Sequence, residues 1–144
     1  MNHVKFNIDG AIEGRVGKAG IGGILRNSEN VTLIMFSKAI GFSDATSAEL
    51  CVIREALVLF VESKWSKQSS LILEIDCTLC AGWLRSPTLA PVSFKILIAD
   101  ILILCAGRAG FSWSIQIVHR EANSTADLLA KKRHTSKLSL GVEV

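Results

Sequence analysis

Four acidic residues that are far apart in the sequence stand where folding could gather them, Asp9, Glu49, Asp76 and Asp127. Asp9 and Asp76 each end a predicted strand, and two such strands side by side would bring both carboxylates to one edge of a sheet. Glu49 lies on the apolar side of a predicted helix, and Asp127 lies at the margin of the apolar stripe of another. Because a buried, unpaired carboxylate is costly, we expect a cation or a strong hydrogen-bond donor beside Glu49.

A cluster of oxygen ligands with few cysteine or histidine neighbours suits a hard divalent ion, Mg²⁺ or Mn²⁺, more than zinc. Two such ions, about 3.5–4 Å apart, could clamp the attacking and leaving oxygens of a phosphodiester. The spacing equally allows Asp9 to be a turn residue, Glu49 a residue of the helix surface and Asp127 a solvated neighbour of Lys131. Both interpretations remain open at this point.

The elements that must position these residues follow from hydrophobic periodicity. Apolar and polar residues alternate over 4–9, as in a half-buried strand, whereas apolar residues recur at helical spacing over 45–63. The glycine-rich segment 10–18 and the segment 27–30 are predicted turns. The predicted strands are 4–9, 19–26, 31–39, 71–76 and 111–118, and the predicted helices are 45–63, 78–84, 92–105 and 123–133. This order predicts an α/β fold in which a five-stranded mixed sheet is flanked by helices.

Composition limits the class of protein. With 144 residues, 49% hydrophobic and 20% charged, the chain should form one globular domain with a conventional core. A formal charge of +3 is compatible with nucleic acid without requiring it. The apolar stretch 94–106 spans thirteen residues and is too short to cross a bilayer. The start of the chain shows no secretory signal, so we expect an intracellular protein of the nucleus or cytoplasm with reduced thiols.

Five segments, taken in order, resemble a ribonuclease H domain, and in particular the plant reverse-transcriptase-like, retroelement-type branch of that superfamily. They are FNIDGA, GIGGILRN, SAELCVIREAL, LEID and HREANSTADLLAK. The resemblance covers about residues 4–133. It implies a ribonuclease H-like domain over 1–134, with three antiparallel strands followed by two parallel ones, and a loosely held C-terminal tail over 135–144.

This resemblance implies Mg²⁺-dependent hydrolysis of the RNA strand of an RNA–DNA hybrid with two metal ions, for which Mn²⁺ could substitute. By analogy Asp9 would bridge both ions, Asp127 would hold the ion that activates water, and Glu49 with Asp76 would hold the ion near the leaving oxygen. The residues implied to contact the substrate are Gly10, Ala11, Cys77, Arg120 and Asn123. The oligomeric state is not predicted.

Three departures from the family favour an alternative, a ribonuclease H-like module that binds nucleic acid with little or no turnover. His119 lies too close to Asp127 to match the mobile loop histidine of many bacterial members, and a structural role at the end of the last predicted strand is favoured. Cys77 stands where related sequences often have Ser. The segment 85–93 carries one basic residue, so a basic extension that grips hybrids is missing. A third hypothesis is a protein-interaction domain that binds neither metal nor hybrid.

Other motifs have competing interpretations. Cys77 and Cys80 form a C-x-x-C after a strand, which is typical of a redox pair, but the element order is not that of thioredoxin and no second pair completes a zinc site. The basic residues at the end of the last predicted helix either complement the helix dipole or contact phosphates. They are Lys131, Lys132, Arg133, His134 and Lys137. Trp65, Trp83 and Trp113 could stack on bases, but the preferred interpretation is that they are core residues.

Overall fold

A computed structural model describes residues 2–107, 111–131 and 138–141 of the chain. The strands are β1 (Asn2–Ile12), β2 (Val16–Arg26), β3 (Thr32–Asp44), β4 (Ser69–Ile75), β5 (Trp113–Ile117) and β6 (Leu138–Gly141). The α-helices are α1 (Ala45–Glu62), α2 (Thr78–Arg85), α3 (Lys95–Gly107) and α4 (Ser124–Lys131). Short 3₁₀ helices are η1 (Lys64–Lys67), η2 (Pro87–Leu89), η3 (Val92–Phe94) and η4 (Arg120–Asn123).

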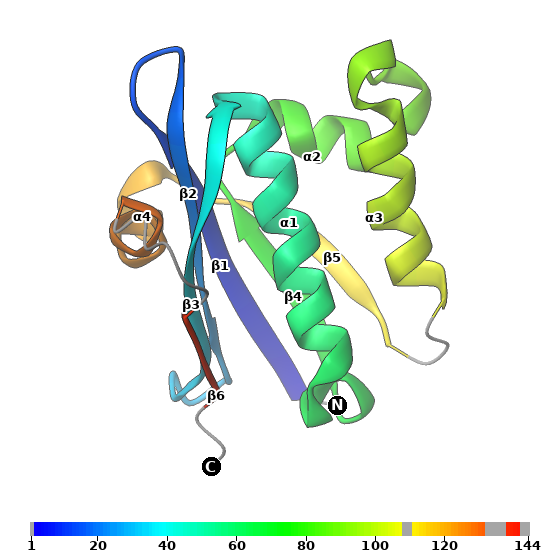
Figure 1. Ribbon diagram of the computed structural model, residues 1–144. Coiled ribbons are helices and arrows are strands. Elements are labelled where there is room, and N and C mark those ends of the chain that lie inside the picture. Colours follow the sequence, from blue (N-terminus) through cyan, green and yellow to red (C-terminus); the bar gives the residue numbers. More distant parts are fainter. Residues whose placement is uncertain (1, 108–110, 132–137, 142–144) are drawn as a thin grey trace.

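The strands form one mixed sheet in the order β5-β4-β1-β2-β3-β6. β1, β2 and β3 are consecutive antiparallel neighbours, whereas β4 runs parallel to both β1 and β5. Helices α1, α2 and α3 lie on one side of this sheet and α4 lies on the other (Figure 1). The predicted α/β architecture with three antiparallel and two parallel strands is confirmed.

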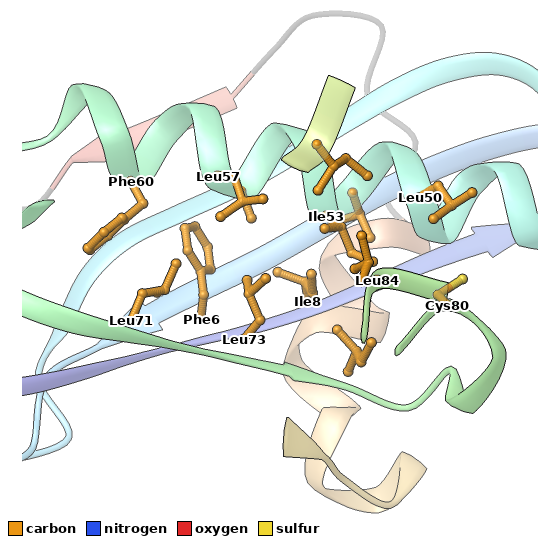
Figure 2. Close-up of a cluster of buried hydrophobic side chains, with 14 of the residues drawn as sticks. Phe6, Ile8, Leu50, Ile53, Leu57, Phe60, Leu71, Leu73, Cys80 and Leu84 are labelled. Atoms are coloured by element: carbon orange, nitrogen blue, oxygen red, sulfur yellow. The ribbon is translucent and has the colours of Figure 1, made fainter. Parts of the chain in front are cut away.

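The core lies between α1 and the sheet. Alternate residues of β1 turn Phe6 and Ile8 toward α1, which turns side chains such as Ile53, Leu57 and Phe60 toward the sheet (Figure 2). All five are fully buried, so the apolar face of the strand and the apolar face of the helix pack against each other. Asp44 caps α1 because its Oδ1 accepts a hydrogen bond of 2.7 Å from the backbone N–H of Ser47.

The first three strands are longer than predicted, and β3, which was expected to end at residue 39, continues to Asp44. The segment 10–18 was expected to be a turn, but β1 continues to Ile12 and β2 begins at Val16, with Gly10 paired to Ile21. Antiparallel pairing satisfies these backbone groups despite the weak strand propensity of glycine. Asp9 consequently lies inside β1 and does not end it. Within the turn that remains, Gly14 has a φ of +70°.

The expected loose tail over 135–144 contains a strand. Residues 138–141 pair antiparallel with β3, from Ile34 opposite Gly141 to Ser37 opposite Leu138. The outer edge of β3 carries unpaired backbone groups, and β6 satisfies them. The remaining residues of that segment, and the basic residues Lys132, Arg133, His134 and Lys137, lie outside the described residues. The domain boundary at 134 stays a prediction.

The tryptophans pack as core residues, as the preferred interpretation held. Trp65, Trp83 and Trp113 are partly buried against the hydrophobic core, and the Trp83 ring stacks on Phe94 at a centroid distance of 5.5 Å. In the part of the chain that the structure describes, no helix combines the length and the apolar character needed to span a membrane.

Candidate metal centre

The end of the β1–β4 seam places two of the predicted carboxylates side by side. β1 and β4 are parallel neighbours with Asn7 opposite Glu74, which sets Asp9 level with Asp76. β4 ends at Ile75, so Asp76 follows the last paired residue of that strand. Glu49 reaches the same place from α1. Ligand oxygens of Asp9, Glu49 and Asp76 all lie within 4.8 Å of one another, so three elements supply one carboxylate cluster.

The expected strong donor beside Glu49 is a backbone group. The Gly10 N–H donates to Asp9 Oδ1 at 2.9 Å and to Glu49 Oε1 at 3.2 Å. Glu49 is 9% exposed, and its Oε2 is buried without a hydrogen-bond partner. Among the residues that the structure describes, no cation pairs with Glu49. The Gly10 N–H is therefore a donor to Glu49, but no described cation offsets a negative charge on this carboxyl group.

Burial changes the protonation of the two least exposed carboxyl groups. Burial raises the pKa of Asp9 from 3.8 to about 6, opposed by a hydrogen bond with Glu49 and supported by the charges of Asp76 and Asp127. Burial and the hydrogen bond with Asp9 raise the pKa of Glu49 from 4.5 to about 10. Without a metal, the Glu49 carboxyl group therefore keeps its proton at neutral pH, whereas in the unfolded chain it would have lost that proton near pH 4.5.

Asp127 lies near this cluster but not inside it. It belongs to the first turn of α4 and is close enough for its charge to raise the pKa of Asp9. Its Oδ2 is paired with Lys131 Nζ at 2.8 Å, which is the solvated arrangement that the spacing alone had left open. Asp127 is therefore paired with Lys131 through one of its two oxygens and is not one of the three clustered carboxylates.

Packing on the far side of the sheet holds α4 close to the cluster. A Cβ atom built on Gly22 would lie 2.5 Å from the Ala130 backbone nitrogen and 2.5 Å from Leu129 Cβ, so only glycine allows α4 to pack here. The Ser37 hydroxyl donates to the Leu129 carbonyl. Gly22 pairs with Asp9 across β1 and β2. This role of Gly22 was not predicted from the sequence, although a glycine inside a strand signals close backbone approach.

Two asparagines join η4 to β1. Asn7 is 4% exposed and its Nδ2 donates to the Ala122 carbonyl at 3.3 Å. The Nδ2 of Asn123 donates to the Ile8 carbonyl at 2.8 Å, and the residue has no exposed surface. Asn123 was expected to contact substrate; its side chain is buried and joins η4, just before α4, to β1, and the substrate contact stays a prediction. Asn7 was not predicted to have a functional role.

The other predicted substrate contacts lie in different environments. Gly10 is half-buried, and a Cβ on it would lie 3.0 Å from Ala48 Cβ, so close packing of α1 is one reason for glycine there. Ala11 is half-buried in β1, and Arg120 is exposed in η4. Cys77 is the N-cap of α2, and a hydrogen bond with Cys80 lowers the pKa of its thiol to about 6. Their substrate roles stay predictions.

The stability of the metal-free protein should fall as pH rises. The folded state binds the protons of Asp9 and Glu49 more tightly than the unfolded state, so this stabilisation is complete below the unfolded pKa values. It is lost as pH passes about 6 for Asp9 and continues to decline toward about 10 for Glu49. Denaturant unfolding with a chelator, from about pH 4 to about pH 8, should show a decline that Asp9→Asn makes shallower. An equal decline in both proteins would contradict this account.

Comparison with known proteins identifies the family. The model of the reverse transcriptase-like family matches residues 7–133. Over 140 residues the chain is 36% identical to a protein of Arabidopsis thaliana whose name assigns it as a ribonuclease H protein. That match covers 96% of this chain and 21% of the relative, so the chain spans about a fifth of the relative's length.

Solved structures show the same fold. An RNase H1 isolated from compost by a metagenomic approach has a TM-score of 0.80 at 24% identity, covering 92% of this chain and 96% of that one. An RNase H1 from the halophilic archaeon Halobacterium salinarum has the same TM-score, identity and coverage. The compost enzyme in complex with an RNA/DNA hybrid gives a TM-score of 0.78 at 22% identity, covering 90% and 94% of the two chains. The chain thus has a ribonuclease H fold and belongs to the reverse transcriptase-like family.

Proposed function

We propose that this chain is a ribonuclease H, an endonuclease that hydrolyses the RNA strand of RNA–DNA hybrids with divalent metal ions bound at the carboxylate cluster. The convergence of Asp9, Glu49 and Asp76 from β1, α1 and the end of β4 carries the proposal. The substrate class comes from the relatives, since an RNase H1 of the same fold binds an RNA/DNA hybrid and the Arabidopsis relative is named for this activity.

The residues present fit hard divalent ions. All donors of the cluster are carboxylate oxygens, which Mg²⁺ and Mn²⁺ prefer. The Oε2 of Glu49 is buried and has no hydrogen-bond partner among the described residues, and a cation that displaces the carboxyl proton would satisfy this oxygen. We propose that Asp9, Glu49 and Asp76 hold the ions and that Asp127 completes the set after releasing Lys131. A pair of Mg²⁺ ions there would supply activated water and stabilise the charge on the leaving oxygen.

The protein's own groups would hold this site rigid. The Gly10 N–H donates hydrogen bonds to one oxygen of Asp9 and one oxygen of Glu49. These bonds orient both carboxyl groups before a metal ion binds. Asn7 and Asn123 anchor η4 to β1 and thereby set the position of α4, which carries Asp127. Such preorganised groups lower the cost of stabilising charge in a transition state.

Divalent ions should stabilise the protein. Millimolar Mg²⁺ is expected to raise the melting temperature. An ion that binds only the folded state increases the free energy of unfolding by RT ln(1 + [L]/Kd). The rise should be largest near neutral pH, where protons leave Asp9, and should vanish in Asp9→Asn. Differential scanning fluorimetry with Mg²⁺, and with matched ionic strength from NaCl, checks this. Equal shifts with both salts would show that the cluster holds no ion.

The activity itself is tested with labelled substrates. Hybrid, all-DNA and all-RNA duplexes of one sequence are incubated with the protein in Mg²⁺, in Mn²⁺ and in a chelator. We expect cleavage of the RNA strand of the hybrid only, with either metal and not with the chelator. Absence of hybrid cleavage in both metals would reject the proposed enzyme.

One observation favours the catalytically weak binding module as a second candidate. Arg85 is the sole basic residue of the segment 85–93, and its Nη2 donates to the Ile115 carbonyl at 2.8 Å. That guanidinium is therefore engaged with the fold. Hybrid binding in a gel-shift assay, without cleavage in Mg²⁺ or Mn²⁺, is the result that this candidate predicts.

A further inference from the structure

The C-x-x-C motif places two sulfur atoms in contact beside the carboxylate cluster. Cys77 is the N-cap of α2, and its Sγ lies 3.1 Å from Cys80 Sγ, within hydrogen-bonding distance. The backbone N–H of Cys80 donates to Cys77 Sγ at 3.4 Å, which orients the first sulfur toward the second. Because a disulfide bond is about 2.05 Å long, closing this pair needs a movement of about 1 Å.

The two thiols differ in access. Cys77 is half-buried and can be reached from solvent, whereas Cys80 has no exposed surface and belongs to the core cluster (Figure 2). This asymmetry suits a pair in which the outer sulfur reacts with an external disulfide and the inner sulfur resolves the product. All four cysteines lie in the described part of the chain, and Cys51 and Cys105 have no sulfur in contact.

The pair is joined directly to the proposed metal site. Cys77 follows Asp76, whose carboxylate belongs to the cluster. The charge of Glu49 is close enough to Cys80 to raise the pKa of its thiol. A displacement of the Cys77 backbone on disulfide formation would therefore act on Asp76 through one peptide unit. Mg²⁺ demands near-ideal octahedral geometry, so its binding is sensitive to small displacements of a ligand.

We propose that Cys77 and Cys80 form a covalent modification site, at which a small-molecule disulfide such as oxidised glutathione creates an intramolecular disulfide that weakens divalent-ion binding at the carboxylate cluster. The disulfide stands on the sulfur geometry alone, and its effect on ion binding rests on the proposed function.

The reaction is a balanced thiol–disulfide exchange. Cys77 Sγ, after losing its proton to solvent, attacks one glutathione sulfur, so a Cys77–glutathione bond forms and one glutathione thiolate leaves and takes up a proton. Cys80 Sγ loses its proton and attacks Cys77 Sγ, which forms the internal disulfide and releases the second glutathione. The two protein thiols lose two electrons, and these reduce one glutathione disulfide to two thiols.

The first experiment measures the modification without using activity. The whole chain is equilibrated in buffers of varied ratio of reduced to oxidised glutathione, its free thiols are alkylated, and each cysteine is quantified by mass spectrometry. We expect Cys77 and Cys80 to lose alkylation together, with no glutathione attached, while Cys51 and Cys105 remain alkylated. Cys80→Ala should trap a glutathione adduct on Cys77, and Cys77→Ser, whose new side chain is a good N-cap, should leave Cys80 reduced. Alkylation of Cys77 and Cys80 at every ratio would overturn the proposal.

The second experiment measures the coupling to the metal site. Calorimetric titration of Mn²⁺ into the reduced and the oxidised protein is expected to show weaker binding to the oxidised form, and reduction should restore the affinity. Cys77→Ser should bind Mn²⁺ equally well before and after oxidant treatment. Equal affinity in both forms of the natural sequence would overturn the coupling. Absence of Mn²⁺ binding in the reduced protein would reject the proposed function while the thiol measurement still decides whether the disulfide forms.

Discussion

Hybrid cleavage is expected to fall about 10³-fold or more when Asp9 is replaced by asparagine, with the fold retained. Metal-ion catalysis supplies several kcal/mol of transition-state stabilisation, and each 1.4 kcal/mol is worth about tenfold in rate. In the proposed function Asp9 is a central ligand, since its oxygens lie with those of Glu49 and Asp76 and the charge of Asp127 raises its pKa. Single-turnover cleavage of a labelled hybrid at saturating protein measures the change.

The structure predicts that Asp9→Asn folds normally. An asparagine Oδ1 can still accept the hydrogen bond that the Gly10 N–H makes with Asp9 Oδ1. The substitution also removes a carboxyl group that burial makes costly to ionise. Asp100→Asn is the matched control, because Asp100 is exposed on α3 and is not part of the cluster. Equal cleavage by Asp9→Asn and Asp100→Asn would show that the carboxylate cluster is not the active site.

Gly22→Ala is expected to destabilise the protein by about 1–3 kcal/mol, the usual cost of overpacking. The added methyl group would meet the Ala130 nitrogen and Leu129 Cβ at 2.5 Å and the Leu129 carbonyl carbon at 2.8 Å. Two of these three atoms belong to the backbone, so α4 must move away from β2. Each 1 kcal/mol corresponds to about 4 °C in the melting temperature of a chain of this size.

The same displacement should reduce activity, because α4 carries Asp127. Cleavage measured well below the melting temperature should fall in Gly22→Ala although the protein is folded. Gly82→Ala is the control, since a Cβ at Gly82, within α2, meets no atom within 4 Å. Alanine there should be neutral or should stabilise the helix by about 0.5–1 kcal/mol. Full activity and stability in Gly22→Ala would mean that α4 can shift without disturbing the site.

Much of the fold could be predicted from local patterns. Apolar alternation in β1 and helical spacing in α1 gave the buried faces that meet in the core, and α1 was predicted to within one residue at its end. The hairpin at 27–30 was predicted by its turn residues, and Asn27 Oδ1 accepts hydrogen bonds of 2.9 Å from the N–H groups of Glu29 and Val31. These features depend on contacts between residues that are close in sequence or on one face of an element.

The errors arose where distant segments decide the outcome. β1 continues beyond Asp9 because it pairs with β2. Residues 138–141, expected to belong to a loose tail, form β6 because they pair with the edge of β3. The bond that holds the Asn123 side chain in the interior runs to the Ile8 carbonyl, 115 residues away in the sequence, and no local pattern indicates it. A single sequence carries no signal for such long-range partners.

The sequence by itself determined which residues have the chemistry for a metal site: four carboxylates with fixed positions relative to their own strands and helices, and few alternative soft ligands. Only the tertiary structure decided which of them meet. Parallel pairing of β1 with β4 set Asp9 level with Asp76, and the packing of α1 brought Glu49 to them, whereas Asp127 remained beside Lys131. The physical reason is that periodicity specifies which face of an element is buried, while the register between strands and the close approach of helices depend on packing across the whole chain.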